Sequence, residues 1–257
     1  MNSFPEQTKI PNPAFDELAE RSKLLGVELH AAALEQIESY CRLLANYNAH
    51  TNLVSKADPK TLINDHLLDS IALLPLIGKA MADKTVNGQL IDIGSGAGFP
   101  GIIVAMLMPQ LSVKLVDSIG KKTRFLAQAA SELQLGDRVS VVTGRAEELG
   151  HDRNFRESFS FATARAVGAL HLVAELTLPL LSVGGFLLAQ KSLKQANGEL
   201  KESGSAISTL GAVVSQVVTL DAEVLGREHC VVFIEKTKPT PRDYPRSAAR
   251  MKKEPLV

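Results

Sequence analysis

The sequence contains little cysteine: Cys41 and Cys230 are its only two, and they lie far apart in a chain of 257 residues. This scarcity excludes a disulfide framework and a cysteine-based zinc site, and it is typical of proteins in a reducing compartment. No apolar run approaches the roughly 20 residues that a membrane-spanning helix requires. Residues 1–9 are polar and lack the apolar segment of a signal peptide. We therefore expect a cytoplasmic protein that binds no metal and no membrane.

Net charge is also absent, because 28 lysine and arginine residues balance 28 aspartate and glutamate residues. The field of the whole molecule therefore attracts neither nucleic acid nor a membrane surface, and any site for RNA must be a local basic patch. Hydrophobic residues make up 45% and charged residues 22% of the chain, which is typical of a globular protein. The length suits one large α/β domain with a small additional region.

The first third of the chain has a helical pattern. Residues 1–13 contain three prolines and few apolar residues, which predicts a flexible tail. Residues 14–85 are expected to form an N-terminal helical region, because apolar side chains recur there at steps of three and four residues. Within this region, Asp58 followed by Pro59 is typical of a helix N-cap and first turn.

Residues 86–237 alternate between predicted strands and helices, as expected of a cofactor-binding α/β domain. Strands are expected at residues 90–93, 111–116, 138–142, 159–164, 186–190, 212–220 and 230–235. Helices are expected at residues 99–108, 121–133 and 170–181, and one more after a polar segment at residues 194–204. This alternation predicts a mostly parallel sheet. The last two strands have no helix between them, which indicates a terminal antiparallel hairpin.

Residues 238–257 form a basic C-terminal tail. From Lys236 onward the chain has seven lysine and arginine residues against two acidic ones, together with four prolines and Tyr244. Two interpretations remain open for this segment. It is either a disordered solubilising tail or an arm that contacts phosphates and releases counterions.

The segment from Asp92 to Gly101 follows a predicted strand and opens a predicted helix. Glycines let the backbone turn sharply there and let a ligand lie against bare main chain. Gly96, Gly98 and Gly101 match the dinucleotide fingerprint. The pattern of S-adenosylmethionine-dependent methyltransferases, an acidic residue before alternating glycines, is met by Asp92, Gly94, Gly96 and Gly98. The loop alone therefore leaves two cofactors open.

Three features favour a methyltransferase over a dinucleotide-dependent oxidoreductase. The carboxylate of Asp92 is placed to reach the amino acid portion of S-adenosylmethionine. Pro100 lacks a backbone N–H, so the helix start has one donor fewer for binding a pyrophosphate. S-adenosylmethionine has no pyrophosphate and does not need this donor. The terminal hairpin also suits the methyltransferase version of the sheet. Under either interpretation, Asp117 at the end of the second strand is expected to bind the ribose hydroxyls.

Further motifs are spaced along most of the chain. They are residues 52–55 (NLVS), 58–59 (DP), 66–70 (HLLDS), 115–118 (LVDS), 120–122 (GKK), 125–126 (FL), 144–148 (GRAEE), 164–166 (ARA), 244–246 (YPR) and 255–256 (PL). Together with the glycine loop, these motifs resemble the RsmG family (older name, glucose-inhibited division protein B). The resemblance runs from about residue 35 to the C-terminus.

The resemblance implies a Rossmann-like class I methyltransferase fold, with a mostly parallel seven-stranded sheet, a terminal antiparallel hairpin and a preceding helical region. It also implies S-adenosylmethionine-dependent methylation of guanine N7 in 16S ribosomal RNA, at the decoding-region loop. Residue by residue, it implies that Gly94 and Phe99 line the cofactor pocket and that Ala146 and Glu147 flank the adenine. It also implies that Arg165 belongs to the cofactor site, at the edge that faces the RNA. Gly96, Gly98 and Asp117 complete the expected cofactor site.

Methylation at N7 requires no general base, because that atom has an in-plane lone pair and no proton to lose. The enzyme needs only to hold N7 in line with the methyl–sulfur bond, and the sequence offers no convincing catalytic base or nucleophile. Candidates for contacts with RNA are His66, Lys121, Lys122, Lys191 and Arg246. Each of these also has an ordinary interpretation as a solvated or paired side chain.

The expected partner is 16S ribosomal RNA or the small ribosomal subunit, with the protein acting as a monomer. Three alternatives remain open at this point. They are a small-molecule methyltransferase, a dinucleotide-dependent oxidoreductase, and a ribosome-assembly or RNA-binding factor that does not catalyse a reaction.

Overall fold

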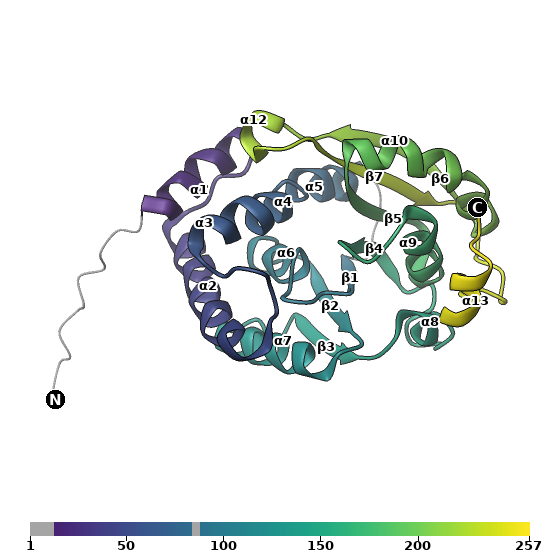
Figure 1. The fold of residues 1–257 in the computed structure, drawn as a ribbon, viewed down its shortest axis with the longest axis horizontal. Helices are drawn as coiled ribbons and strands as arrows, with labels where there is room; N and C mark the ends of the chain where they lie inside the picture. Colours follow the sequence, from purple (N-terminus) through teal and green to yellow (C-terminus); the bar gives the residue numbers. More distant parts are fainter. Residues whose placement is uncertain (1–12, 84–87) are drawn as a thin grey trace, which may run out of the picture.

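The computed structural model describes residues 13–83 and 88–257, and it contains a seven-stranded sheet in the order β3-β2-β1-β4-β5-β7-β6 (Figure 1). The strands are β1 (Gln89–Ile93), β2 (Ser112–Asp117), β3 (Val139–Thr143), β4 (Phe159–Ala164), β5 (Leu181–Ser192), β6 (Ala212–Thr219) and β7 (His229–Lys236). β7 is antiparallel to both neighbours, whereas the other pairs are parallel. The predicted sheet with its terminal antiparallel hairpin is confirmed.

The N-terminal region is helical, as predicted, over the residues that the structure describes. Its elements are α1 (Pro13–Leu24), α2 (Ala31–Thr51), α3 (Pro59–Leu62), the π-helix η1 (Ile63–Leu67), α4 (Leu68–Ile71) and α5 (Leu74–Asp83). The Asp58 carboxylate accepts a hydrogen bond from the backbone N–H of Thr61 at 3.0 Å, which confirms the predicted N-cap. The flexible tail predicted for residues 1–13 lies outside the described residues, apart from Pro13.

Helices cover both faces of the sheet, and these are α6 (Gly101–Leu107), α7 (Gly120–Glu132), α8 (Ala146–Leu149), α9 (Leu170–Thr177), α10 (Leu193–Glu202) and α11 (Gly204–Thr209). Successive strand residues alternate between two buried clusters. Leu115 and Phe161 belong to the cluster that contains α2, α6 and α7. Val116 and Ala162 belong to the cluster that contains α9, α10 and α11. Because both faces are covered, the strand ends are where the sheet can present side chains to a ligand.

Two helical segments differ from the sequence expectation. The polar segment 194–204 lies largely within α10, which begins with a capping box: Gln195 N–H donates to Ser192 Oγ, and the Gln195 side chain accepts from Ser192 N–H. A single turn, α12 (Ala222–Leu225), lies between β6 and β7, where no helix was expected. The Asp221 carboxylate caps it by accepting from the N–H of Glu223 at 2.9 Å. Local capping therefore starts both helices where apolar periodicity is weak.

The C-terminal residues 238–257 pack against the body of the protein (Figure 1). Arg156 donates a hydrogen bond to the carbonyl oxygen of Tyr244 at 2.9 Å. The segment ends with α13 (Ala248–Lys253), whose Met251 is buried against the sheet domain. The interpretation of this segment as a disordered tail is therefore wrong. Among residues 13–83 and 88–257, no helix is long and apolar enough to cross a membrane.

Arg246 ties this segment to α9 through Glu175, which is 1% exposed. The Arg246 guanidinium donates to both carboxylate oxygens, at 2.8 and 2.7 Å. Arg246→Met should lower the free energy of unfolding by about 3 kcal/mol, because Glu175 becomes an uncompensated buried charge. Urea denaturation measures this change. Arg250→Met is the control, since Arg250 is 64% exposed, and equal stability of the two variants would contradict the prediction.

Candidate cofactor and substrate site

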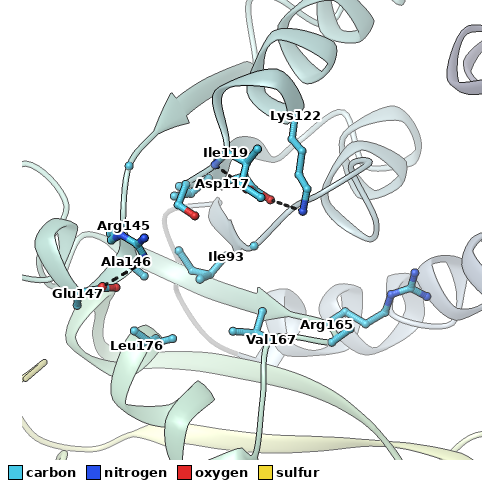
Figure 2. A pocket seen from close by; sticks show the side chains of 15 residues that line it. Ile93, Asp117, Ile119, Lys122, Arg145, Ala146, Glu147, Arg165, Val167 and Leu176 are labelled. Atoms are coloured by element: carbon cyan, nitrogen blue, oxygen red, sulfur yellow. Dashed lines mark hydrogen bonds and ion pairs between the residues drawn. The ribbon is translucent and has the colours of Figure 1, made fainter. Parts of the chain in front are cut away.

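A cavity of about 300 Å³ lies at the carboxyl ends of the central strands (Figure 2). It is next to the point where the strand order reverses between β1 and β4, which is where open α/β sheets bind ligands. The predicted cofactor residues that line it are Gly94, Asp117, Ala146, Glu147 and Arg165. The structure therefore brings together residues from the ends of four strands that are far apart in the sequence.

The glycine loop after β1 adopts left-handed backbone conformations. The φ angle is +72° at Gly94, +59° at Gly96 and +98° at Gly98, a region that glycine enters without strain. The N–H of Gly94 donates to the carbonyl oxygen of Val116 at 2.9 Å, which fixes the loop against β2. Gly94 lines the cavity, whereas a Cβ at Gly98 would lie 3.1 Å from the Tyr40 hydroxyl. Gly98 thus serves the packing of α2 against the loop.

Asp117 ends β2 at the cavity wall and is 5% exposed. Its carboxylate accepts hydrogen bonds from the backbone N–H groups of Gly96 and Ile119, at 3.0 and 2.9 Å. The Lys122 ammonium lies 3.6 Å from the same carboxylate. These contacts fix the side chain, and carboxylate oxygens can accept further hydrogen bonds. The position is therefore compatible with the expected contact to ribose hydroxyls.

Asp92 lies beneath the glycine loop and not in the cavity wall. It is 1% exposed, and its carboxylate accepts from the Thr163 hydroxyl at 2.8 Å and from the Gly101 N–H at 3.3 Å. The side chain thereby joins β1 to β4 and to the first residue of α6. The expectation that this carboxylate reaches the amino acid portion of the cofactor is wrong, because both of its oxygens face the protein interior.

Asp92 should leave a measurable pH dependence of stability. Burial raises the pKa of Asp92 to about 6, although the hydrogen bond from Thr163 acts in the opposite direction. The folded protein therefore holds this proton more tightly than the unfolded chain. The contribution of Asp92 to the free energy of unfolding consequently falls as the pH rises from about 4 to about 6. Between about pH 5 and about pH 7 we expect a loss of about 1 kcal/mol in the free energy of unfolding. Urea denaturation of the wild type and Asp92→Asn tests this, since the variant should lack that loss; identical pH dependence would contradict it.

Ala146 and Glu147 begin α8 directly after β3. Figure 2 shows them across the cavity from Arg165, with the side chains of Val167 and Leu176 between the two sides. The Glu147 side chain is 14% exposed, and its carboxylate lies 3.9 Å from the Arg145 guanidinium. On this side of the cavity, the apolar side chains of Val167 and Leu176 beside the Glu147 carboxylate suit a planar base that carries an amino group. This is the environment expected around an adenine.

Arg165 leaves β4 at the opposite rim of the cavity, and its guanidinium points toward the N-terminal helices (Figure 2). It donates hydrogen bonds to the Asp65 carbonyl oxygen at 2.8 Å, to the Asp69 carboxylate at 3.2 Å and to His66 Nδ1. The guanidinium also lies over the Phe99 ring, 5.8 Å from its centroid. With 18% of its side chain exposed, Arg165 is a fixed cation at the rim.

His66 packs against Phe99 and accepts a hydrogen bond from Arg165. The His66 and Phe99 rings are stacked, with centroids 4.8 Å apart and planes inclined by 14°. Burial, followed by the positive charge of Arg165, lowers the pKa of His66 to about 4, so the ring is neutral near pH 7. Arginine can only donate, so Nδ1 accepts and the ring proton is on Nε2. Phe99 does not line the cavity; it braces the glycine loop against η1.

Asp69 is the buried anion of this cluster and is 2% exposed. Besides Arg165, it accepts a hydrogen bond from Arg227 at 2.7 Å and lies 3.3 Å from His229 Nδ1. Arg227 and His229 come from the β6–β7 hairpin. Sequence reasoning missed both, because no motif or spacing connects the hairpin to the glycine loop. The structure shows that residues from three separate regions fix the position of Arg165.

Comparison with known proteins identifies the family. Residues 33–231 match the GidB family model, described as rRNA small subunit methyltransferase G. The chain belongs to this family. It is 38% identical to ribosomal RNA small subunit methyltransferase G of Desulfitobacterium hafniense, over 91% of this chain and 93% of that protein. The protein of the same name from Streptococcus pneumoniae is 37% identical, over 96% of this chain and 99% of that protein. The resemblance to the RsmG family is confirmed.

The fold is shared with more distant methyltransferases. The crystal structure of a putative sarcosine dimethylglycine methyltransferase from Galdieria sulphuraria matches 77% of this chain and 98% of that chain, with a TM-score of 0.52 and 9% identity. Such low identity indicates the fold alone. Together with the sheet order, it confirms the Rossmann-like methyltransferase fold.

The basic side chains that were candidates for RNA contacts have different surroundings in this GidB family member. Lys121 is exposed in the first turn of α7, and Lys122 approaches Asp117. Lys191 and Arg246 instead form ion pairs within the fold, with 9% and 10% of their side chains exposed. Lys121 is therefore the most accessible of these lysine and arginine side chains to an RNA phosphate.

Proposed function

We propose that this chain uses S-adenosylmethionine to methylate N7 of a guanine in 16S ribosomal RNA, at the decoding-region loop of the small subunit. The observation that carries the proposal is the cavity beside Gly94, Asp117 and Arg165, in a chain that belongs to the rRNA small subunit methyltransferase G family. With the ribosome as its substrate, the protein is proposed to act in the cytoplasm as a monomer.

The residues around the cavity fit S-adenosylmethionine. A Cβ at Gly94 would lie only 2.8 Å from Val167 Cγ2, which also lines the cavity, so glycine is required at this position of the wall. Asp117 would hold the ribose, and Ala146 and Glu147 would flank the adenine. When bound, S-adenosylmethionine supplies an electrophilic methyl group on its sulfonium. The chain's own contribution is to orient the guanine beside it and to exclude water.

Arg165 is the residue proposed to orient the RNA. Its hydrogen bonds to Asp65, Asp69 and His66 use both hydrogens of Nη1 and one of Nη2. Among the residues that the structure describes, the remaining N–H groups of Arg165 have no hydrogen-bond acceptor and can donate to RNA. Guanine presents the acceptors O6 and N7 on one edge, whereas adenine presents an amino donor in place of O6. A fixed donor at the rim therefore favours guanine.

The titratable groups near the cavity are engaged in ways that suit a reaction without a general base. His66 accepts at Nδ1 from Arg165, and its other ring nitrogen carries the proton. The Asp92 carboxylate is buried beneath the loop, and the Asp117 carboxylate accepts from two backbone N–H groups. Because N7 has a free lone pair and no proton to lose, none of these groups needs to act as a base.

The test uses purified protein, methyl-labelled S-adenosylmethionine and small ribosomal subunits that lack the modification. After the reaction, borohydride and aniline treatment breaks the RNA chain at 7-methylguanosine. We expect label in the RNA and one new break in the decoding-region loop. Label in the RNA without a break would mean that an atom other than N7 is methylated. No transfer to subunits or naked RNA, despite cofactor binding, would favour a small-molecule substrate or a factor without catalysis.

A further inference from the structure

The loop between β4 and α9 forms one side of the cavity. Its residues Arg165, Ala166 and Val167 line the cavity, and Ala166 is exposed. The φ angle of Ala166 is +57°, a left-handed conformation that costs a residue with a Cβ roughly 1 kcal/mol or more. Such a conformation persists only where the surrounding structure holds it. Side chains from other elements hold the loop at both ends.

Asp69, Asp65 and His66 hold the first end through Arg165. At the second end, the Lys191 ammonium donates to the carbonyl oxygen of Gly168. Lys191 also lies 2.9 Å from the Glu199 carboxylate, and only 9% of its side chain is exposed. Its charge is therefore directed to groups within the chain.

Glu199 contacts the next part of the same segment. Its Oε2 accepts a hydrogen bond from the backbone N–H of Leu170, the first residue of α9, at 2.7 Å. The N-cap of α9 is Ala169, which has no side-chain acceptor. Glu199 of α10 thus accepts the hydrogen bond that an N-cap side chain would otherwise accept. It also places a negative charge at the N-terminus of α9, where that charge is favourable. Lys191 and Glu199 therefore bind the backbone on the two sides of Ala169, at Gly168 and at Leu170.

We propose that Lys191 and Glu199 are a pair of positioning residues that hold residues 165–170 in the conformation that presents Arg165 to the RNA. The two side chains come from rigid elements, since Lys191 is in β5, paired with Cys230 of β7, and Glu199 is in α10. This inference rests on the proposed function for its effect on RNA. It assigns the Lys191 charge to the loop and not to an RNA phosphate.

The kinetic test compares Lys191→Met and Glu199→Gln with the control Lys194→Met, an exposed lysine on the same helix as Glu199. We expect kcat on small ribosomal subunits to fall by about tenfold or more in both variants and to stay unchanged in the control, because small misplacements of a positioning loop have effects of this size. The double variant should lose no more than the worse single variant, because the two residues act as a unit. Wild-type kcat in Lys191→Met would overturn the proposal.

The salt dependence of RNA affinity separates positioning from phosphate contact. A lysine that contacts a phosphate contributes about one to the slope of log Kd against log salt concentration. We expect Lys191→Met to keep the wild-type slope. A slope reduced by about one, with kcat unchanged at saturating RNA, would assign Lys191 to the RNA backbone and overturn the proposal.

Hydrogen exchange tests the positioning role without any RNA. The amides of residues 165–170 should exchange faster in Lys191→Met and Glu199→Gln than in the wild type, and at the wild-type rate in Lys194→Met. Thermal unfolding checks that each variant is folded. If the wild-type protein transfers no methyl group to ribosomal RNA, the proposed function fails, but the exchange result still decides whether the pair holds the loop. Unchanged exchange in both variants would overturn the pair's role.

Discussion

Gly94→Arg is expected to weaken S-adenosylmethionine binding at least about hundredfold, equivalent to about 2.7 kcal/mol. Gly94 lines the cavity, and a Cβ there would approach Val167 Cγ2 to 2.8 Å. The arginine side chain would have to enter the space proposed for the cofactor, and its positive charge would oppose the sulfonium. Isothermal titration calorimetry of the variant measures the loss directly.

The control for this prediction is Gly184→Arg. Gly184 has a φ angle of +87° but nothing within 4 Å of its Cβ position. Both variants therefore carry a similar left-handed backbone strain, roughly 1–2 kcal/mol, while only the change at Gly94 obstructs the cavity. We expect wild-type affinity in Gly184→Arg, and a larger loss of stability in Gly94→Arg because its Cβ also meets Val167 Cγ2. If folded Gly94→Arg bound S-adenosylmethionine as the wild type does, the cofactor would have to lie elsewhere.

Arg165→Gln is expected to lower kcat/KM for small ribosomal subunits by about hundredfold, while the affinity for S-adenosylmethionine changes far less. The substitution removes the fixed cation at the rim that is proposed to orient the guanine. The fold should survive, because the Asp69 carboxylate keeps the Arg227 guanidinium at 2.7 Å. Steady-state kinetics with subunits, together with calorimetry for the cofactor, separates the two effects.

Two further variants test whether the guanidinium of Arg165 is specifically required. Arg165→Lys keeps the charge but loses the planar fork, so it should recover only part of the activity. Arg42→Gln removes an arginine that is 59% exposed and whose contacts with Glu38 and Ser39 lie within α2, and it should behave as the wild type. A hundredfold loss of cofactor affinity in Arg165→Gln, with kcat unchanged, would contradict a role in RNA recognition and assign Arg165 to the cofactor.

Most of the fold could be predicted from the sequence because its strands are encoded locally. Strands buried on both faces appear as short, mostly apolar runs, as in residues 90–93 and 159–164, and every predicted strand overlaps an observed one. The prediction of a polar segment without a helix at residues 194–204 was wrong for the opposite reason, because this helix is not marked by an apolar pattern. α10 begins at the capping box of Ser192 and Gln195, and its few apolar residues give little periodicity.

The sequence also located the core of the candidate site. A strand followed by a glycine loop and a helix leaves the loop at the carboxyl edge of the sheet, and Gly94 of this loop lies in the cavity wall at that edge. The direction of the Asp92 side chain could not be read in this way. Successive side chains of a strand point to opposite faces, and only the packing of Thr163 and Gly101 shows that this carboxylate lies under the loop.

By itself, the sequence determined the sheet, the glycine loop and the family, because these depend on local patterns and on motifs whose spacing is fixed along the chain. The tertiary structure alone decided which charges meet. Arg165 contacts Asp69, 96 residues away, and Asp69 contacts Arg227, 158 residues away. Likewise, Arg246 and Lys191 were candidates for RNA contacts until their partners Glu175 and Glu199 were known. A charged side chain has no inherent preference between a phosphate and a carboxylate, so its role depends on the neighbours that folding brings to it.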